Sequence, residues 1–187
     1  MSKKVKINFQ KEYALYKACA KKDNFRPSME MVHFKDGCAY ASESHILVKV
    51  PLCVCTNLNE EFWGRLEGFS VNGKVLKFIY GFDEIFVDKN EENDTCHIVG
   101  TMGGSEFRIQ LQRTGDVGAP NFDSVLKQDN EKVPVGSIGL NTKRLSDLAN
   151  ALGTEVTELN FCSSNKPTRI ETADGAIGMI VPVMIAD

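Results

Sequence analysis

The 187-residue sequence lacks the features on which most enzyme and membrane-protein assignments rest. Its longest apolar stretches, such as IGMIVPVMIA near the C-terminus, cover about half of the ~20 residues that a membrane-spanning helix requires. The first residues, MSKKVKINF, contain lysines but no apolar segment, so no signal peptide is expected. There is no phosphate-binding loop, no GxGxxG fingerprint and no GxSxG elbow. We therefore expect a cytoplasmic protein without a membrane segment.

Cysteine and histidine are too scattered to predict a metal site. Only Cys53 and Cys55 lie close together, and they lack both finger spacing and a second pair. The three histidines, His33, His45 and His97, show no ligand spacing either. We expect free, mostly buried thiols in a reducing compartment, with no metal and no cofactor.

The charge balance argues against a protein coated with basic residues, because the net charge is −3 and the isoelectric point is near 5.7. It leaves a local basic face open, since binding to a polyanion depends on how charge is distributed. At 42% hydrophobic residues, the chain is long enough to bury the core of one domain or a domain and a half.

One order of elements, strand–helix–strands, recurs three times from near residues 4, 70 and 136. The first unit is predicted as a strand (4–9), a helix (10–22) and a hairpin (29–34 and 38–50) around Asp36-Gly37. The second has a helix at 72–82 and strands at 84–89, 95–100 and 105–112, after a segment at 59–69 that fits either a short helix or an extended chain. A connector at 113–134 leads to a strand (137–141), a helix (142–153) with Thr142 as N-cap and Gly153 as C-cap, and strands at 155–164, 168–175 and 176–185. The pattern predicts an α+β fold.

Three landmarks in this order resemble the bacterial sliding clamp, the β subunit of DNA polymerase III. Residues 42–47 (SESHIL) end a predicted strand where the family often has TDGHRL. Residues 120–126 (PNFDSVL) resemble the family's PDYxxVL linker, and residues 180–183 (IVPV) resemble its terminal VMPM-like strand. The sequence departs from the family at Ile46, which replaces an arginine, at Ser44, which replaces a glycine, and in the valines that replace the terminal methionines.

The resemblance implies a DNA clamp fold of about three units, with antiparallel sheets outside and helices on the inner face. Residues 1–126 would form one complete clamp-like domain, 127–134 a linker and 135–187 half a domain. A ring of several copies, or a dimer, would be the corresponding homo-oligomer.

The resemblance also implies two binding sites and no catalytic one. A pocket for short linear peptides of replication or repair proteins would be lined by Ser42, Ser44, His45, Ile46, Leu47, Pro120, Val125, Met179, Val181, Pro182 and Val183. Basic helix faces would contact the phosphates of double-stranded DNA through Lys17, Lys21, Lys74, Lys77, Lys143 and Arg144. The expected function is a non-catalytic, DNA-associated processivity or scaffold protein.

Two other functions stay open beside it. A clamp fold can serve as a protein-interaction or regulatory module that never encircles DNA. A small hydrolase or nuclease is the third, because 41-ASESHILV-48 contains a glutamate, serines and a histidine. We expect no such chemistry, since neighbours on one strand point to opposite faces and this would separate Ser44 from His45.

Overall fold

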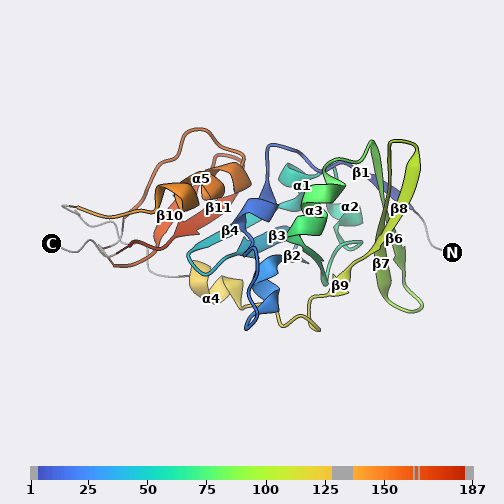
Figure 1. Ribbon diagram of the computed structural model, residues 1–187, viewed down its shortest axis with the longest axis horizontal. Helices are drawn as coiled ribbons and strands as arrows, with labels where there is room; N and C mark the ends of the chain where they lie inside the picture. The colour runs from blue at the N-terminus through green and yellow to red at the C-terminus, as the bar shows by residue number, and fades with distance from the viewer. Residues whose placement is uncertain (1–3, 128–136, 162, 164, 184–187) are drawn as a thin grey trace.

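The computed structural model describes residues 4–127, 137–161, 163 and 165–183, and these form a mixed α+β fold with antiparallel sheets, as the sequence predicted (Figure 1). The strands are β1 (Val5–Ile7), β2 (Met31–Lys35), β3 (Cys38–Ser42), β4 (Ile46–Pro51), β5 (Phe69–Asn72), β6 (Glu84–Asn90), β7 (Thr95–Met102), β8 (Ser105–Gln110), β9 (Gln112–Arg113), β10 (Thr168–Glu171) and β11 (Ile177–Ile180). The helices are η1 (Leu15–Ala18) and η2 (Pro27–Glu30), both 3₁₀, and α1 (Leu52–Cys55), α2 (Glu60–Trp63), α3 (Gly73–Ile79), α4 (Phe122–Leu126) and α5 (Thr142–Ala151).

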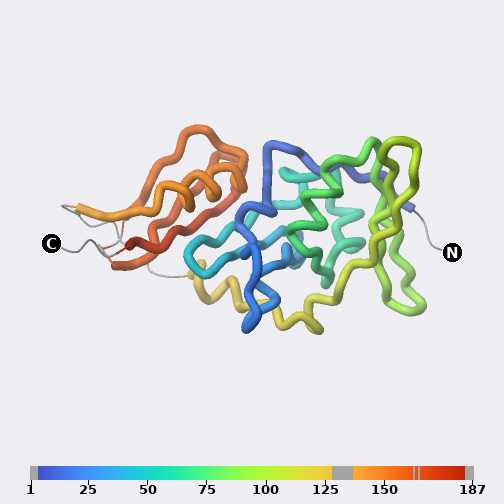
Figure 2. Tube along the Cα trace, in the orientation of Figure 1, coloured from blue at the N-terminus to red at the C-terminus, as the bar shows by residue number. Residues whose placement is uncertain are grey.

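The strands make two sheets. The smaller has the order β1-β6-β7-β8, and the larger has the order β10-β11-β4-β3-β2-β5-β9. The chain path places the four-stranded sheet at one end of the long axis and the β10–β11 hairpin toward the other (Figure 2). Because β4 pairs with β11, the larger sheet runs through both predicted domains. The predicted division of the chain into domains that end at 126 and begin at 135 stays a prediction. The predicted linker between them lies outside the described residues except for Lys127.

Strand alternation gives the larger sheet two buried faces. Ala39 and Ala41 on β3 point into the main core, beneath η1, α3 and α5. Tyr40, between them, points to the opposite face and joins a second, smaller cluster with Leu47, Phe122, Leu126 and Met179. Helix α4, which lies in the connector predicted from sequence, covers this second face and contributes Phe122 and Leu126 to a separate apolar core.

Helix α5 packs closely on β11 because Gly178 has no side chain. A Cβ atom built there would lie 2.7 Å from Leu152 Cδ1 and 3.0 Å from Leu148 Cδ1. Both leucines are fully buried, so the glycine lets the helix approach the strand directly. This contact is what holds the third unit's helix on the sheet beside η1.

The prediction of a helix over residues 10–22 is wrong. Only Leu15–Ala18 is helical, as a single 3₁₀ turn. Tertiary hydrogen bonds compete with the helix: the Ala14 N–H donates to the Asn150 carbonyl, and the Ala20 N–H donates to the Met29 carbonyl. Tyr13, within the predicted helix, is buried and donates its hydroxyl to Asp174.

The other helices follow the sequence more closely. Helices α3 and α5 fall within the predicted ranges, but the N-cap of α5 is Asn141, whose side chain accepts from the Arg144 N–H. Residues 59–69 contain the short helix α2. The predicted strand 155–164 is reduced to a bridge between Asn160 and Arg169, with residues 162 and 164 outside the described part. The strand at 137–141 is reduced to a bridge between Gly139 and Val183.

The predicted hairpin at 29–50 contains a second turn that the sequence interpretation missed. Asp36 and Gly37 have positive φ and join β2 to β3, as expected. The predicted single strand 38–50, however, is divided into β3 and β4, which pair with each other. Ser44, with φ of 75°, lies in the turn between them. The SESHIL segment is therefore a hairpin turn, and not the end of one strand.

Candidate functional site

The turn at residues 43–45 stands at the edge of an apolar pocket of about 200 Å³ on the sheet face opposite α5. We call this the apolar pocket. It brings together three segments that are far apart in sequence: the β3–β4 turn, the connector with α4, and β11 with the residues after it. Nine of the eleven residues predicted for a peptide pocket line it: Ser42, Ser44, His45, Ile46, Leu47, Pro120, Val125, Met179 and Val181.

Backbone pairing explains how these segments meet. Leu47 on β4 is the register partner of both Ser42 on β3 and Met179 on β11, so one row of side chains crosses three strands. Just beyond the row, the Val181 N–H donates to the His45 carbonyl at 2.8 Å and extends the pairing past the end of β11. The floor of the apolar pocket is thus part of the sheet itself.

Helix α4 forms the other wall. The Phe122 ring stacks on Tyr40, with ring centroids 5.1 Å apart, and lies 5.5 Å from the His33 ring. His33 is buried, with hydrogen bonds to Ser70 Oγ and the Ser28 carbonyl, and burial lowers its pKa. His33 therefore supports the wall as a neutral, structural side chain.

The two remaining predicted pocket residues lie outside the lining. Pro182 is half-buried, and Val183 is 39% exposed, with its N–H donating to the Gly139 carbonyl at 2.9 Å. The segment after β11 thus pairs its backbone with residue 139 and contributes only Val181 to the apolar pocket.

Four lining residues were not among the predicted ones: Arg26, Met29, Phe122 and Pro167. The Arg26 guanidinium donates to Ser44 Oγ at 2.7 Å and pairs with Asp23 at 2.9 Å, which fixes the loop before η2 against the turn. No periodicity in residues 20–30 indicated that role. Phe122 was not predicted to line the pocket, although it lies inside the PNFDSVL landmark.

On the opposite, helix-bearing side of the sheet, a second hollow is lined by basic residues. Its volume is about 570 Å³, and an adjoining hollow of about 430 Å³ shares Lys17, Lys21 and Lys143 with it. We call the two together the basic groove. The six residues predicted to contact DNA, namely Lys17, Lys21, Lys74, Lys77, Lys143 and Arg144, all line it.

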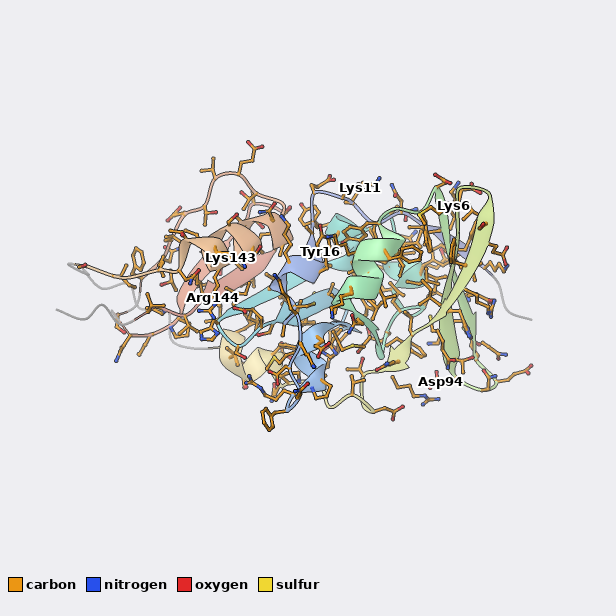
Figure 3. All side chains as sticks on the ribbon, in the orientation of Figure 1. Lys6, Lys11, Tyr16, Asp94, Lys143 and Arg144 are labelled. Carbon is orange, nitrogen blue, oxygen red and sulfur yellow. The ribbon has the colours of Figure 1, made fainter. Side chains whose placement is uncertain are left out.

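The elements that carry these cations pack side by side. Tyr16 on η1 lies between α5 and α3, with Lys143 and Arg144 on the α5 side (Figure 3). The Lys77 ammonium is 5.7 Å from the centre of the Tyr16 ring, a cation–π contact that holds the lysine over the groove. Asp147 also lines the groove and opposes the basic charge.

The SESHIL turn does not assemble a catalytic relay. Ser42 Oγ donates to the Ile46 carbonyl at 2.8 Å, and Ser44 Oγ accepts from Arg26. Within the described residues His45 Nδ1 has no hydrogen-bond partner, and its nearest carboxylate oxygen, from Glu43, is 3.8 Å away. The sequence argument from strand alternation was wrong in its premise, because these residues form a turn. The serines are nonetheless held by partners other than histidine.

Three of the described cysteines are poor nucleophiles, because they are buried as thiols. Cys19, Cys55 and Cys96 are buried, and burial raises the pKa of each thiol to about 12. Cys53 is exposed, and Cys38 is half-buried. Among the described residues, no three His, Cys, Asp or Glu side chains gather to hold a metal ion, and no helix there is long and apolar enough to cross a membrane.

Comparison with solved structures identifies the fold as that of bacterial sliding clamps. The β sliding clamp of Caulobacter crescentus matches with a TM-score of 0.67 and 14% identity over 96% of this chain and 65% of that one. The Bartonella birtlesii clamp bound to griselimycin gives 0.65 and 13% over 96% and 66%, and the Helicobacter pylori clamp bound to a DNA ligase peptide gives 0.64 and 10% over 97% and 66%.

No protein-family model matches the sequence, and no curated protein matches it. At 10–14% identity, the likeness to these clamps defines the fold alone. The chain spans 65–66% of their length.

Proposed function

We propose that this protein is a non-catalytic, clamp-like scaffold that docks short peptides of replication or repair proteins in the apolar pocket and holds double-stranded DNA along the basic groove. The observation that supports this most is the convergence of the three sequence landmarks on one pocket. Each landmark comes from a different part of the chain, and strand pairing together with the packing of α4 brings all three to one apolar pocket.

The composition of the apolar pocket suits a short peptide. Leu47 and Met179 form an apolar floor, while Arg26, Ser44 and His45 supply polar groups at the edge. A volume of about 200 Å³ accommodates one or two apolar side chains of a ligand. A few buried anchors of this kind supply most of the affinity of a peptide complex, and the polar edge fixes its orientation. The H. pylori clamp binds a DNA ligase peptide, which makes that peptide a suitable probe.

The basic groove suits a polyanion backbone. Lys21, Lys74, Lys77 and Lys143 are exposed, so their charges are available to phosphates. Contacts of this type attract DNA without reading its sequence, and they weaken as salt rises because bound counterions are released. The proposal therefore includes sequence-independent, salt-sensitive binding.

The alternative is an interaction module that never encircles DNA. Asp23, Glu43 and Asp147 line the groove, and Glu43 is paired with Arg144 at 2.8 Å, so these carboxylates act against DNA binding. Retention on circular but not linear duplexes at moderate salt supports encirclement. No DNA binding at low salt, together with intact peptide binding, favours the module.

The peptide proposal is tested by calorimetric titration of the H. pylori DNA ligase peptide and of griselimycin. Val181 lines the apolar pocket and is half-buried, so Val181→Asp places a charge in the binding surface with little cost to the core. We expect binding to wild type and a loss of at least about tenfold in the variant. Val156→Asp is the control, because Val156 is 87% exposed and does not line the pocket. Absence of binding by wild type to both probes, or equal binding by V181D, would contradict the proposal.

A further inference from the structure

His45 lies where the two hollows meet, because its side chain lines both the basic groove and the apolar pocket. The side chain is 44% exposed, yet its Nδ1 atom is buried and has no hydrogen-bond partner among the described residues. A buried polar atom without a partner raises the free energy of the arrangement that contains it. The turn therefore has an unmet hydrogen bond between the two proposed binding sites.

One carboxylate lies within reach of this atom. Glu43 Oε1 is 3.8 Å from His45 Nδ1, too far for a hydrogen bond, and 2.8 Å from Arg144 Nε. Glu43 is thus paired with the groove and not with the pocket edge. Its backbone is held in the turn, because the Glu43 N–H donates to the Ile46 carbonyl at 3.2 Å. A rotation of the Glu43 side chain alone can therefore carry the carboxylate from one partner to the other.

We propose that Glu43 switches between these two partners, and that duplex DNA in the basic groove and a peptide in the apolar pocket favour the same arrangement. In the arrangement observed, Glu43 binds Arg144 and His45 Nδ1 is unpaired. In the other, Arg144 binds a DNA phosphate and Glu43 accepts a hydrogen bond from His45 Nδ1. The switch rests on the proposed function, because it couples the two sites named there.

Duplex DNA favours the second arrangement because it competes for the guanidinium. The Arg144 and Glu43 side chains are 28% and 25% exposed, and an ion pair that water reaches contributes little to stability. A phosphate is a strong, two-oxygen acceptor for arginine. A DNA phosphate in the groove can therefore displace the carboxylate of Glu43 from Arg144.

A peptide favours the second arrangement for a different reason. When a peptide covers the apolar pocket, it excludes water from the side of His45 that lines the pocket. The cost of an unpaired Nδ1 then rises, since a polar atom without a partner is more costly in less polar surroundings. A hydrogen bond to Glu43 removes that cost and releases Arg144 to the groove. Each ligand should thus raise the affinity for the other by the same factor.

Fluorescence anisotropy of a labelled duplex, with and without saturating H. pylori DNA ligase peptide, tests the coupling. We expect the peptide to tighten duplex binding by wild type about fivefold. In Arg144→Gln the peptide should leave the duplex affinity unchanged, because the competing partner of Glu43 is gone. Lys143→Gln is the matched control, since Lys143 is the neighbouring cation on α5 and lines the same groove. It should weaken duplex binding but keep the effect of the peptide.

The His45 ring provides a measurement that needs no peptide. In long-range nitrogen–proton NMR spectra, saturating duplex should shift the Nδ1 signal of His45 in wild type but not in R144Q, and should leave the buried His33 unchanged. A direct contact between DNA and His45 would instead shift this signal in both proteins and overturn the switch.

Failure of the switch differs from failure of the proposed function. Wild type that binds duplex and peptide independently, or a peptide effect that persists in R144Q, would overturn the switch and leave the proposed function standing. Wild type that fails to bind the duplex or the peptide would overturn the proposed function and the switch with it.

Discussion

Arg144 on α5 and Glu43 in the β3–β4 turn form an ion pair, with 2.8 Å between Arg144 Nε and Glu43 Oε1. The pair joins the basic groove to the turn that lines the apolar pocket, since Glu43 and His45 face the groove while Ser44 and His45 line the pocket. Both side chains are about a quarter exposed, so the Arg144 charge is substantially neutralised in the absence of a competing phosphate.

Glu43→Gln should therefore strengthen DNA binding. The change removes a carboxylate from the groove and frees one guanidinium, so the affinity should rise severalfold and the log–log salt slope should steepen by about 0.9, one additional phosphate contact. Fluorescence anisotropy with a labelled duplex at several salt concentrations measures both quantities. Glu91→Gln, in the exposed β6–β7 turn, is the control. An unchanged slope in E43Q would mean that Arg144 takes no part in binding.

Phe122→Ala should destabilise the fold by about 3 kcal/mol, because it removes a buried ring that stacks on Tyr40 and supports the wall of the apolar pocket. Phe25→Ala is the matched control: Phe25 is 95% exposed, so its removal should change the free energy of unfolding by less than about 0.5 kcal/mol. Urea denaturation followed by circular dichroism measures both. Equal effects of the two substitutions would show that α4 is not packed as described.

The contact between Tyr13 and Asp174 should depend on pH. Burial acts to raise the pKa of Asp174, but hydrogen bonds donated by Thr172 and Tyr13 outweigh it, so the pKa lies below its ordinary value. A lowered pKa in the folded state adds stability above the unfolded pKa, near 4, and that stability is lost as the pH falls through the folded pKa.

Asp174→Ala should thus lower the free energy of unfolding by about 1 kcal/mol at pH 7, and the deficit relative to wild type should shrink below about pH 4. Denaturation in urea at pH 7, 5, 4 and 3 measures the difference. Asp83→Ala, an exposed aspartate, should show no deficit at neutral pH. A deficit that persists undiminished at pH 3 would show that the carboxylate charge does not contribute.

Cys53 should react with a thiol reagent before the other described cysteines, because it is exposed while burial raises the pKa of Cys19, Cys55 and Cys96 to about 12. Timed labelling with a maleimide, followed by peptide mass spectrometry, gives the order of modification. Labelling of the three buried thiols in the native protein at the rate of Cys53 would contradict their burial.

The sequence predicted most of the strands and the two helices that show clear periodicity. Helices α3 and α5 have apolar residues at helical spacing, and the turns at Asp36-Gly37 and Gly103-Gly104 have the residues that positive φ requires. Residues 10–22 show the same periodicity, but hydrogen bonds to Asn150 and Met29 override it. Such contacts join segments distant in sequence, which a local pattern cannot reveal.

The residues of the candidate sites also fall into two groups, those that the sequence could predict and those that it could not. Leu47 and Met179 were predicted because the resemblance to the clamp family places their segments in one pocket, and the pairing of β4 with β11 does bring them together. Arg26 and Met29 could not, since the loop with Arg26 and the short helix η2 with Met29 show no periodic pattern, and their position depends on the contacts of Arg26 with Asp23 and Ser44. The turn at Ser44 was missed because no glycine or proline marks it, and the only local signal is the run of four polar residues at 42–45.

Methyl NMR tests the central claim most directly. With isotope-labelled Ile, Leu, Val and Met methyl groups, addition of the H. pylori DNA ligase peptide should shift the signals of Val125, Met179 and Val181, and leave Val75 and Leu145 on the helix-bearing side unchanged. Shifts confined to the apolar pocket would support peptide docking there. No shifts at millimolar peptide, or shifts centred on the basic groove, would contradict it.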